Sequence, residues 1–189
     1  MSKITTRQRI IAMADDLFYQ QGFEHTSFTK IATILNISRG NFYYHFKTKN
    51  QILQAVIERR LYKTQEMLDR WEQQETTPEQ RIKCYIRIVA TNWSKIKNYG
   101  CPVGTLSNEL AKLNHLSHSH ANRVFSLFKN WLEKQFSQLN TKVDADRLAM
   151  HVLAWSQGVA TMANAFQDKA FVLDEVNRMC TWVDSYSSK

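Results

Sequence analysis

The chain has 189 residues, of which 43% are hydrophobic and 22% are charged. This is the composition of a globular protein, and it excludes a disordered chain. The length suits one domain, or a small domain joined to a larger one. Only five Gly and two Pro occur, so we expect an all-α fold of long helices with short connections.

The formal net charge is +8, and its distribution is uneven. Residues 1–63 hold ten Lys and Arg against four Asp and Glu, whereas the remaining 126 residues hold fifteen against thirteen. Positive charge gathered in the first third of the chain suits contact with the phosphates of a nucleic acid. Generic solubility is the alternative, and charge alone does not choose between them.

Several classes of protein are disfavoured by simple patterns. No run approaches the ~18 apolar residues of a membrane span, and Ile10–Ala14 is too short for a signal peptide. The three cysteines, Cys84, Cys101 and Cys180, form no CxxC pair and no disulfide framework. We therefore expect a soluble, cytoplasmic protein that makes no membrane contact and keeps its thiols reduced.

The first predicted helix covers about residues 5–21, with Thr5 or Thr6 as its cap and Gly22 as its stop. Its apolar side chains recur at helical spacing: Ile10, Ile11, Ala14, Leu17 and Phe18.

Two short helices follow, over about residues 27–35 and 38–46. Ser27 and Ser38 are suitable N-caps, and Asn36 tolerates the positive φ of a tight turn between them. Two short helices joined by about three residues are the layout of a helix-turn-helix.

A long helix is predicted over 48–73, and Thr77-Pro78 begins the next one. The remaining helices are expected over 78–98, 104–114, 118–139, 144–167 and 171–186, which makes about nine in all. We divide the chain into a DNA-binding domain, 1–47, and a helical ligand-binding and dimerisation domain, 48–189, with 48–73 as the linking helix.

The second helix of a helix-turn-helix enters the major groove of double-stranded DNA by its N-terminal residues. Arg39 can make bidentate contacts to guanine, and Asn41 can pair with adenine or bond to a phosphate. Gly40 removes a side chain where the backbone approaches the duplex. The other predicted contacts lie nearby: Ser27, Thr29, Ser38, Tyr43, Tyr44, His45, Lys47 and Lys49.

The segment Thr26–Leu53 resembles the DNA-binding domain of TetR-family repressors. The shared elements are Thr26, Ile31-Ala32, and the run Ile37-Ser38-x-Gly40-x-x-Tyr43-x-His45-Phe46, followed by Lys and Leu. Asn36 stands where the family usually has Gly, and it can adopt the same backbone. A second segment, Gly100-Cys101 with Leu106 and Glu109, resembles a branch of the family with members that respond to electrophiles or oxidants.

The resemblance implies a mechanism. The last two long helices would form a homodimer that reads a palindromic operator, and a small apolar or aromatic effector in the helical body would release the DNA. From their apolar pattern, we expect dimer contacts from Leu153, Val159, Met162, Phe166, Val176, Met179, Trp182 and Val183. Burial within one subunit is the alternative.

The chain after residue 90 is rich in aromatic residues, some of which we expect to line an effector pocket. The predicted lining is Trp93, Cys101, Leu106, Phe128, Trp131 and Trp155; packing in the core or the dimer interface is the alternative for each.

Other functions are weighed against this one. Cys101, beside Gly100 and Pro102 at a helix break, is the candidate for a thiol sensor of electrophiles, with ordinary burial as the alternative. His115, His118 and His120 fit a solvated turn better than a zinc site. No phosphate loop, nucleophile elbow or HExxH motif occurs, so we expect no catalytic site, metal or cofactor. A helical enzyme or binding protein with a degenerate DNA domain is the remaining alternative.

Overall fold

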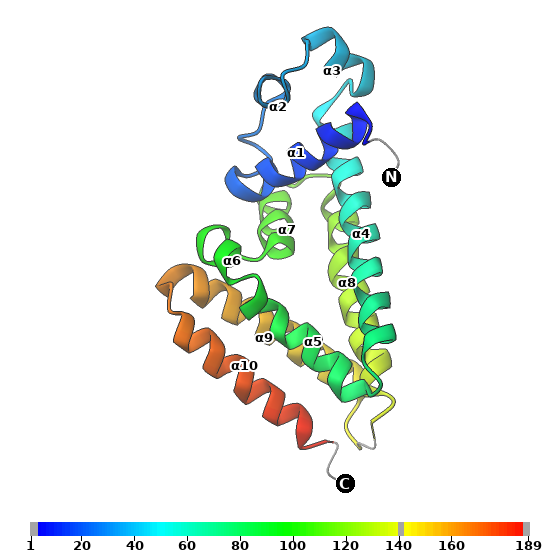
Figure 1. Cartoon of the computed structure of the whole chain (residues 1–189), viewed down its shortest axis with the longest axis vertical. Helices are drawn as coiled ribbons and strands as arrows, with labels where there is room; N and C mark the ends of the chain where they lie inside the picture. The colour runs from blue at the N-terminus through cyan, green and yellow to red at the C-terminus, as the bar shows by residue number, and fades with distance from the viewer. Residues whose placement is uncertain (1–3, 140–141, 187–189) are drawn as a thin grey trace. The chain divides into compact units, whose positions relative to one another are not determined.

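The computed structural model describes residues 4–139 and 142–186, and this part of the chain is all-helical, which confirms the expected fold class (Figure 1). Its helices are α1 Thr6–Gln21, α2 Phe28–Leu35, α3 Arg39–His45, α4 Lys49–Gln74, α5 Pro78–Thr91, α6 Trp93–Tyr99, α7 Pro102–Lys112, α8 His118–Phe136, α9 Ala145–Phe166 and α10 Lys169–Asp184.

The helix expected over 78–98 is two helices in the structure. Asn92, with φ −94° and ψ 14°, ends α5 and begins α6. Its N–H donates to the Ile88 carbonyl, while its own carbonyl accepts from the N–H of Lys95 and of Ile96. Because Asn92 takes part in the hydrogen bonds of both helices, the break leaves little trace in the hydrophobic pattern.

The described residues fall into two compact units, 4–63 with 105–123 and 64–104 with 124–139 and 142–186. Helices α4, α7 and α8 each supply residues to both units. The boundary expected after residue 47 separates the predicted DNA-binding segment from the rest of the chain, and it stays a prediction.

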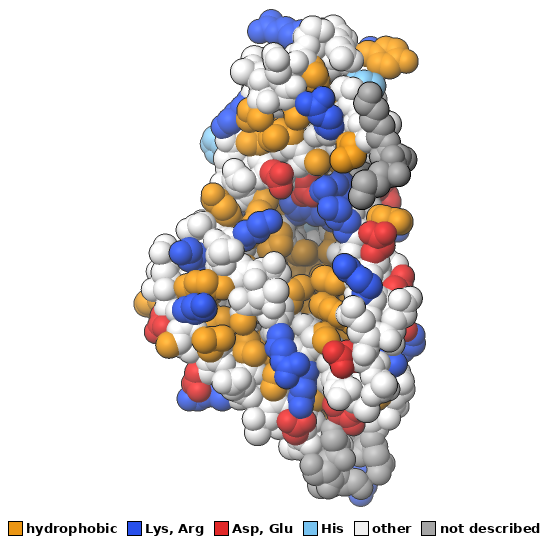
Figure 2. Space-filling view, viewed as in Figure 1, with side chains coloured by type: hydrophobic (Ala, Val, Ile, Leu, Met, Phe, Trp, Pro, Cys, Tyr) orange, Lys and Arg blue, Asp and Glu red, His pale blue; other side chains and the backbone are white. Residues whose placement is uncertain are grey.

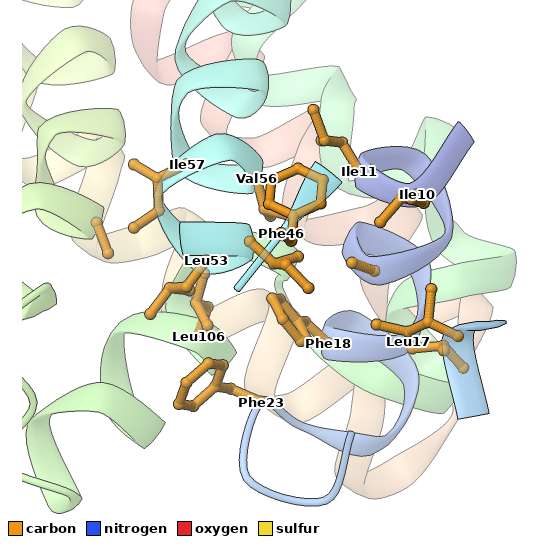
Figure 3. Packing of buried hydrophobic residues seen from close by; sticks show 14 of the residues in the cluster. Ile10, Ile11, Leu17, Phe18, Phe23, Phe46, Leu53, Val56, Ile57 and Leu106 are labelled. Carbon is orange, nitrogen blue, oxygen red and sulfur yellow. The ribbon is translucent and has the colours of Figure 1, made fainter. Parts of the chain in front are cut away.

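The first unit has one hydrophobic core, to which α1, α3, α4 and α7 all contribute (Figure 3). Ile10 and Ala14 of α1, and Ile52 and Leu53 of α4, are completely buried. Leu106 of α7 belongs to the same cluster, close to Leu53 and to Phe23 in the turn after α1. Residues 105–112 are thus part of the unit that carries the helix-turn-helix.

Polar contacts add to this core. The carboxylate of Asp15 on α1 accepts hydrogen bonds from Arg59 at 2.6 Å and Arg60 at 2.7 Å on α4. Arg9 of α1 donates to the Leu35 carbonyl at the end of α2, with 3.3 Å between the atoms. Hydrogen bonds between charged groups are stronger than neutral ones, so the two arginines of α4 tie it to α1 through one carboxylate.

In the second unit α5 packs against α9 and α10, and α6 packs against α9. The hydroxyl of Tyr85 on α5 lies 2.9 Å from that of Ser156 on α9, and both side chains are buried. Burial raises the pKa of Tyr85 well above its ordinary value. Arg81 donates to the carbonyls of Glu72 and Glu75, which closes the end of α4.

No helix within the described ranges is both long enough and apolar enough to cross a membrane.

Candidate nucleic-acid interface

The turn between α2 and α3 forms as the cap residues predict. The hydroxyl of Ser27 accepts the Lys30 N–H at 3.2 Å, and that of Ser38 accepts the Asn41 N–H at 3.2 Å. Asn36 adopts the left-handed conformation, with φ 51° and ψ 50°. The next residue, Ile37, donates its N–H to the Ala32 carbonyl at 3.1 Å, which is the hydrogen bond of a Schellman-type stop.

One side of α3 is anchored in the core. Phe42 is 1% exposed, and its ring centroid lies 4.9 Å from that of Phe28 on α2. The Tyr43 ring lies against Phe28 from the outer side, at 5.7 Å. These contacts set the rotation of α3 about its axis, with Arg39, Gly40 and Asn41 exposed before the anchored residues.

The residues predicted to contact DNA are mostly on the outer side of α2 and α3. Arg39, Gly40 and Asn41 are exposed at the start of α3, and Tyr44 is 79% exposed near its end. His45 is half-buried, with its ring 5.1 Å from that of Tyr44. The remaining exposed members are Ser27, Thr29, Ser38, Tyr43 and Lys47. Figure 2 shows Lys and Arg side chains at the surface around these helices.

Gly40 has no role in the fold that requires glycine. It is the second residue of α3, and a Cβ added there would meet no other heavy atom within 4 Å. Glycine inside a helix costs roughly 0.5–1 kcal/mol relative to alanine. The described part of the chain therefore gives no packing reason for glycine at this exposed position near the start of α3.

Lys49, which is also predicted to contact DNA, makes contacts within its own unit. Its ammonium donates to the Glu24 carbonyl at 2.8 Å and lies 4.4 Å from the centroid of the Phe23 ring. Burial lowers the pKa of Lys49, while the carboxylates of Glu24 and Glu109 oppose this shift. Lys49 thus stabilises a turn of its own unit, which makes it a weaker candidate for phosphate contact than the exposed Lys47.

The residues predicted to line an effector pocket are divided in the structure. Trp93, Cys101 and Trp155 pack around one cluster of the second unit. Phe128 contacts Tyr85, and Trp131 contacts Trp71, in the same unit. Leu106 is instead buried in the core of the first unit. The apolar pattern of α7 does not distinguish these two surroundings, and the predicted pocket lining stays a prediction.

Most of the residues predicted for the dimer interface are buried within one chain. Leu153, Val159, Val176, Met179 and Val183 have exposed fractions of 7% or less. Only Met162 and Phe166 are exposed, at 39% and 74%, while Trp182 is half-buried against His151 and Tyr186. The buried five join α9 and α10 to their own subunit, and a partner would meet the exposed side of these helices.

His115, His118 and His120 lie in the first unit, and each is within hydrogen-bonding distance of a neighbouring side chain. His115 Nε2 is 3.1 Å from Asn50 Oδ1, and His120 Nε2 is 2.7 Å from the Glu58 carboxylate. His118 Nε2 is 3.1 Å from the amide nitrogen of Asn122. Among the described residues, no three His, Cys, Asp or Glu side chains are grouped so as to hold a metal ion.

Glu109 is not among the site residues that the sequence predicts, but it makes a long-range contact with the turn after α1. Glu109 of α7 accepts hydrogen bonds from the backbone N–H of Phe23 at 2.8 Å and of Glu24 at 2.9 Å. Glu109 lies 86 residues after Phe23 and 85 residues after Glu24 in the chain, so no local sequence pattern predicts the contact. The only signal was the place of Glu109 in the segment that begins at Gly100-Cys101.

Comparisons with known proteins find similar helix-turn-helix regulators. The family model for bacterial regulatory proteins of the tetR family matches residues 10–56. An HTH-type transcriptional regulator from the lacX 3′ region of Lactococcus lactis subsp. lactis is 26% identical, covering 86% of this chain and 85% of the relative. The regulator TtgR of Pseudomonas putida is 22% identical over 95% and 89%. In fold, a TetR regulator from Legionella pneumophila superposes with a TM-score of 0.84, covering 98% of both chains at 23% identity.

Proposed function

We propose that this chain, a transcriptional regulator that belongs to the tetR family of bacterial regulatory proteins, acts as a dimeric repressor. In this proposal two copies bind a palindromic operator, and a small apolar or aromatic effector releases it. A two-fold dimer places its two reading helices about one DNA turn apart, ~34–36 Å, so each copy reads one half of the palindrome.

The outward side of α3 is the observation that carries the proposal. Phe42 holds the helix from inside, while Arg39, Gly40 and Asn41 stand exposed at its start. Arg39 and Asn41 are assigned to base edges, because their side chains match guanine and adenine in the major groove. Phosphate contacts are assigned to Ser27, Thr29, Ser38, Tyr43, Tyr44, His45 and Lys47.

A dimer interface is supported by apolar side chains that one chain leaves uncovered. Ala154, Gly158 and Met162 follow at a spacing of four, so they share one side of α9, and all three are exposed. Leu173 on α10 is also exposed, at 45%. Figure 2 shows hydrophobic side chains at the surface over α9 and α10. A partner copy would remove this area from water.

The effector site is assigned to the second unit. Trp93, Cys101 and Trp155 pack against the same buried cluster there, and the Trp155 indole donates to the Glu175 carboxylate at 3.3 Å. The Cys101 sulfur lies 3.5 Å from the Gly104 N–H, at the start of α7. This capping contact accounts for Cys101 without redox chemistry, and no observation favours the thiol-sensor function or a helical enzyme over the effector-controlled regulator.

Selection of a binding site tests the proposed function. The full chain is incubated with a random-sequence duplex library, and the retained DNA is sequenced. We expect a palindrome, bound by two chains per duplex as measured by sedimentation, with an affinity at least 10³-fold above that for random duplex. Retention of no preferred sequence at low salt would contradict the proposal.

Gly40→Ala is expected to change stability and DNA binding in opposite directions. The added methyl meets no atom of the chain, so the free energy of unfolding should rise by about 0.5–1 kcal/mol. Affinity for the selected duplex should fall by roughly tenfold, because the methyl would collide with the duplex where the backbone of α3 approaches it. Thermal unfolding and fluorescence anisotropy measure the two effects. If affinity rises together with stability, α3 does not approach the duplex by this end.

A further inference from the structure

The turn that leads from α1 into α2 is held by its own backbone conformation and by buried side chains. Gly22 has φ +90°, a backbone conformation that favours glycine. Phe23 and Thr26 are both buried, and the Thr26 hydroxyl donates to the Gly22 carbonyl at 2.7 Å. Because the next residue, Ser27, caps α2, the position of this turn sets where α2 begins.

Glu109 holds this turn from outside the helix-turn-helix. One of its carboxylate oxygens accepts the Phe23 N–H and the other accepts the Glu24 N–H, at 2.8 Å and 2.9 Å. Hydrogen bonds to an ionised acceptor are about twice as strong as neutral ones. The fit is close, because a Cβ on Gly22 would lie 2.9 Å from a Glu109 oxygen.

The other side of the turn is held by α4 and by the segment after α7. The Lys49 ammonium bonds to the Glu24 carbonyl and stacks on Phe23. The His115 ring meets Phe23 edge-on, with 5.3 Å between the ring centroids. The turn is therefore enclosed by groups from elsewhere in the first unit, and Glu109 satisfies two of its backbone donors.

A shift of the turn would be passed on to the reading helix. The turn continues into α2, and Phe28 of α2 packs on Phe42 of α3 with 4.9 Å between the rings. Close-packed side chains are hard to compress and transmit strain, so a displacement of α2 would also displace α3. Glu109 lies on α7, so its carboxylate makes the position of both helices depend on where residues 105–112 of α7 stand.

We propose that Glu109 is a positioning residue for DNA recognition, which sets the placement of α2 and α3 by fixing the backbone at Phe23 and Glu24. This inference rests on the proposed function of the chain. It goes beyond that function by naming a residue that controls DNA affinity without touching DNA.

The sign of the effect separates positioning from simple electrostatics. Neutralising a carboxylate makes the first unit more positive, and this alone strengthens attraction to phosphates. Loss of the turn contact acts the other way, because it weakens the specific fit. In Glu109→Gln, the amide keeps one acceptor oxygen but turns an NH₂ group toward the second backbone N–H.

The experiment compares Glu109→Gln and Glu109→Asp with Asp16→Asn, a control that neutralises an exposed carboxylate on α1 of the same unit. Binding is measured by anisotropy with the duplex selected by the wild-type chain and with a random-sequence duplex. Both Glu109 variants are expected to lose about tenfold in affinity for the selected duplex only. Asp, which keeps the charge but is one methylene shorter, cannot satisfy both donors.

Hydrogen exchange gives the readout that a general loss of stability would not produce. In both Glu109 variants the amides of Phe23 and Glu24 are expected to exchange faster, while those in the core of α1 and α4 keep their wild-type rates. Retained binding to random duplex shows that the variants are folded.

Three outcomes would overturn the inference. If Glu109→Gln binds the selected duplex as well as Asp16→Asn does, Glu109 has no positioning role although the proposed function stands. If both Glu109 variants lose affinity for the selected duplex while the amides of Phe23 and Glu24 exchange at their wild-type rates, the loss does not come from the turn. If the wild-type chain prefers no sequence, the proposed function fails and this inference fails with it.

Discussion

Arg39→Ala is expected to lower the affinity for the selected duplex by about a hundredfold or more and to relax the choice of base at one position of each half-site. A bidentate contact from arginine to guanine contributes ~1–3 kcal/mol, and a two-fold dimer loses it twice. The side chain is exposed at the first position of α3, so its removal leaves the core around Phe42 untouched. Anisotropy with duplexes varied at each base pair measures both effects.

Arg70→Ala provides the matched control, because Arg70 is exposed on α4 in the second unit and carries the same charge. It should leave the base preference unchanged. The assignment of α3 as the reading helix would be wrong if Arg39→Ala lost affinity equally for every sequence, since that is the behaviour of a phosphate contact.

Gly158→Glu is expected to separate the dimer and, with it, abolish specific binding. A Cβ at Gly158 meets no heavy atom of its own chain within 4 Å, so the single subunit accommodates the new side chain. In a dimer formed through the exposed side of α9, however, two glutamates would be buried without partners, at a cost of several kcal/mol each. A single subunit contacts only half of the palindrome, so we expect affinity to fall more than a hundredfold.

Sedimentation equilibrium at micromolar concentration measures the change, with a mass near 22.2 kDa expected for the variant and twice that for the wild type. Asn130→Glu places the same charge at an exposed site on α8 and should remain dimeric. A dimeric Gly158→Glu chain with unchanged thermal stability would show that α9 does not meet a partner on this side.

The helix-turn-helix is the part of the structure that the sequence predicts best, because its determinants are local. A serine N-cap bonds to a backbone N–H three residues on, and Asn36 reaches positive φ without help from distant residues. The break at Asn92 was not predictable in the same way. Its backbone joins two helices with nearly continuous hydrogen bonding, and the apolar periodicity runs through it.

In the second unit, the helical spacing of apolar residues does not predict which side of a helix is covered. Helical spacing places Leu153 and Met162 equally well among apolar residues, but it does not say which side the same chain covers. In the structure Leu153, Val159 and Val176 are buried within one chain, whereas Met162 stays exposed. Long-range contacts such as Glu109 with Phe23 are hidden for the same reason: they depend on how distant segments meet.

The pairing of Asp15 with Arg59 and Arg60 bears on how the protein would search a chromosome. Positions 1–63 hold ten basic residues. Arg59 and Arg60 both bond to the carboxylate of Asp15, and Lys49 donates to the Glu24 carbonyl. Fewer cations are thus left for phosphates than the sequence suggests, and each phosphate contact steepens the salt dependence by about 0.9. We therefore expect the protein to dissociate quickly from random DNA, and to stay bound for long only where α3 contacts the correct bases.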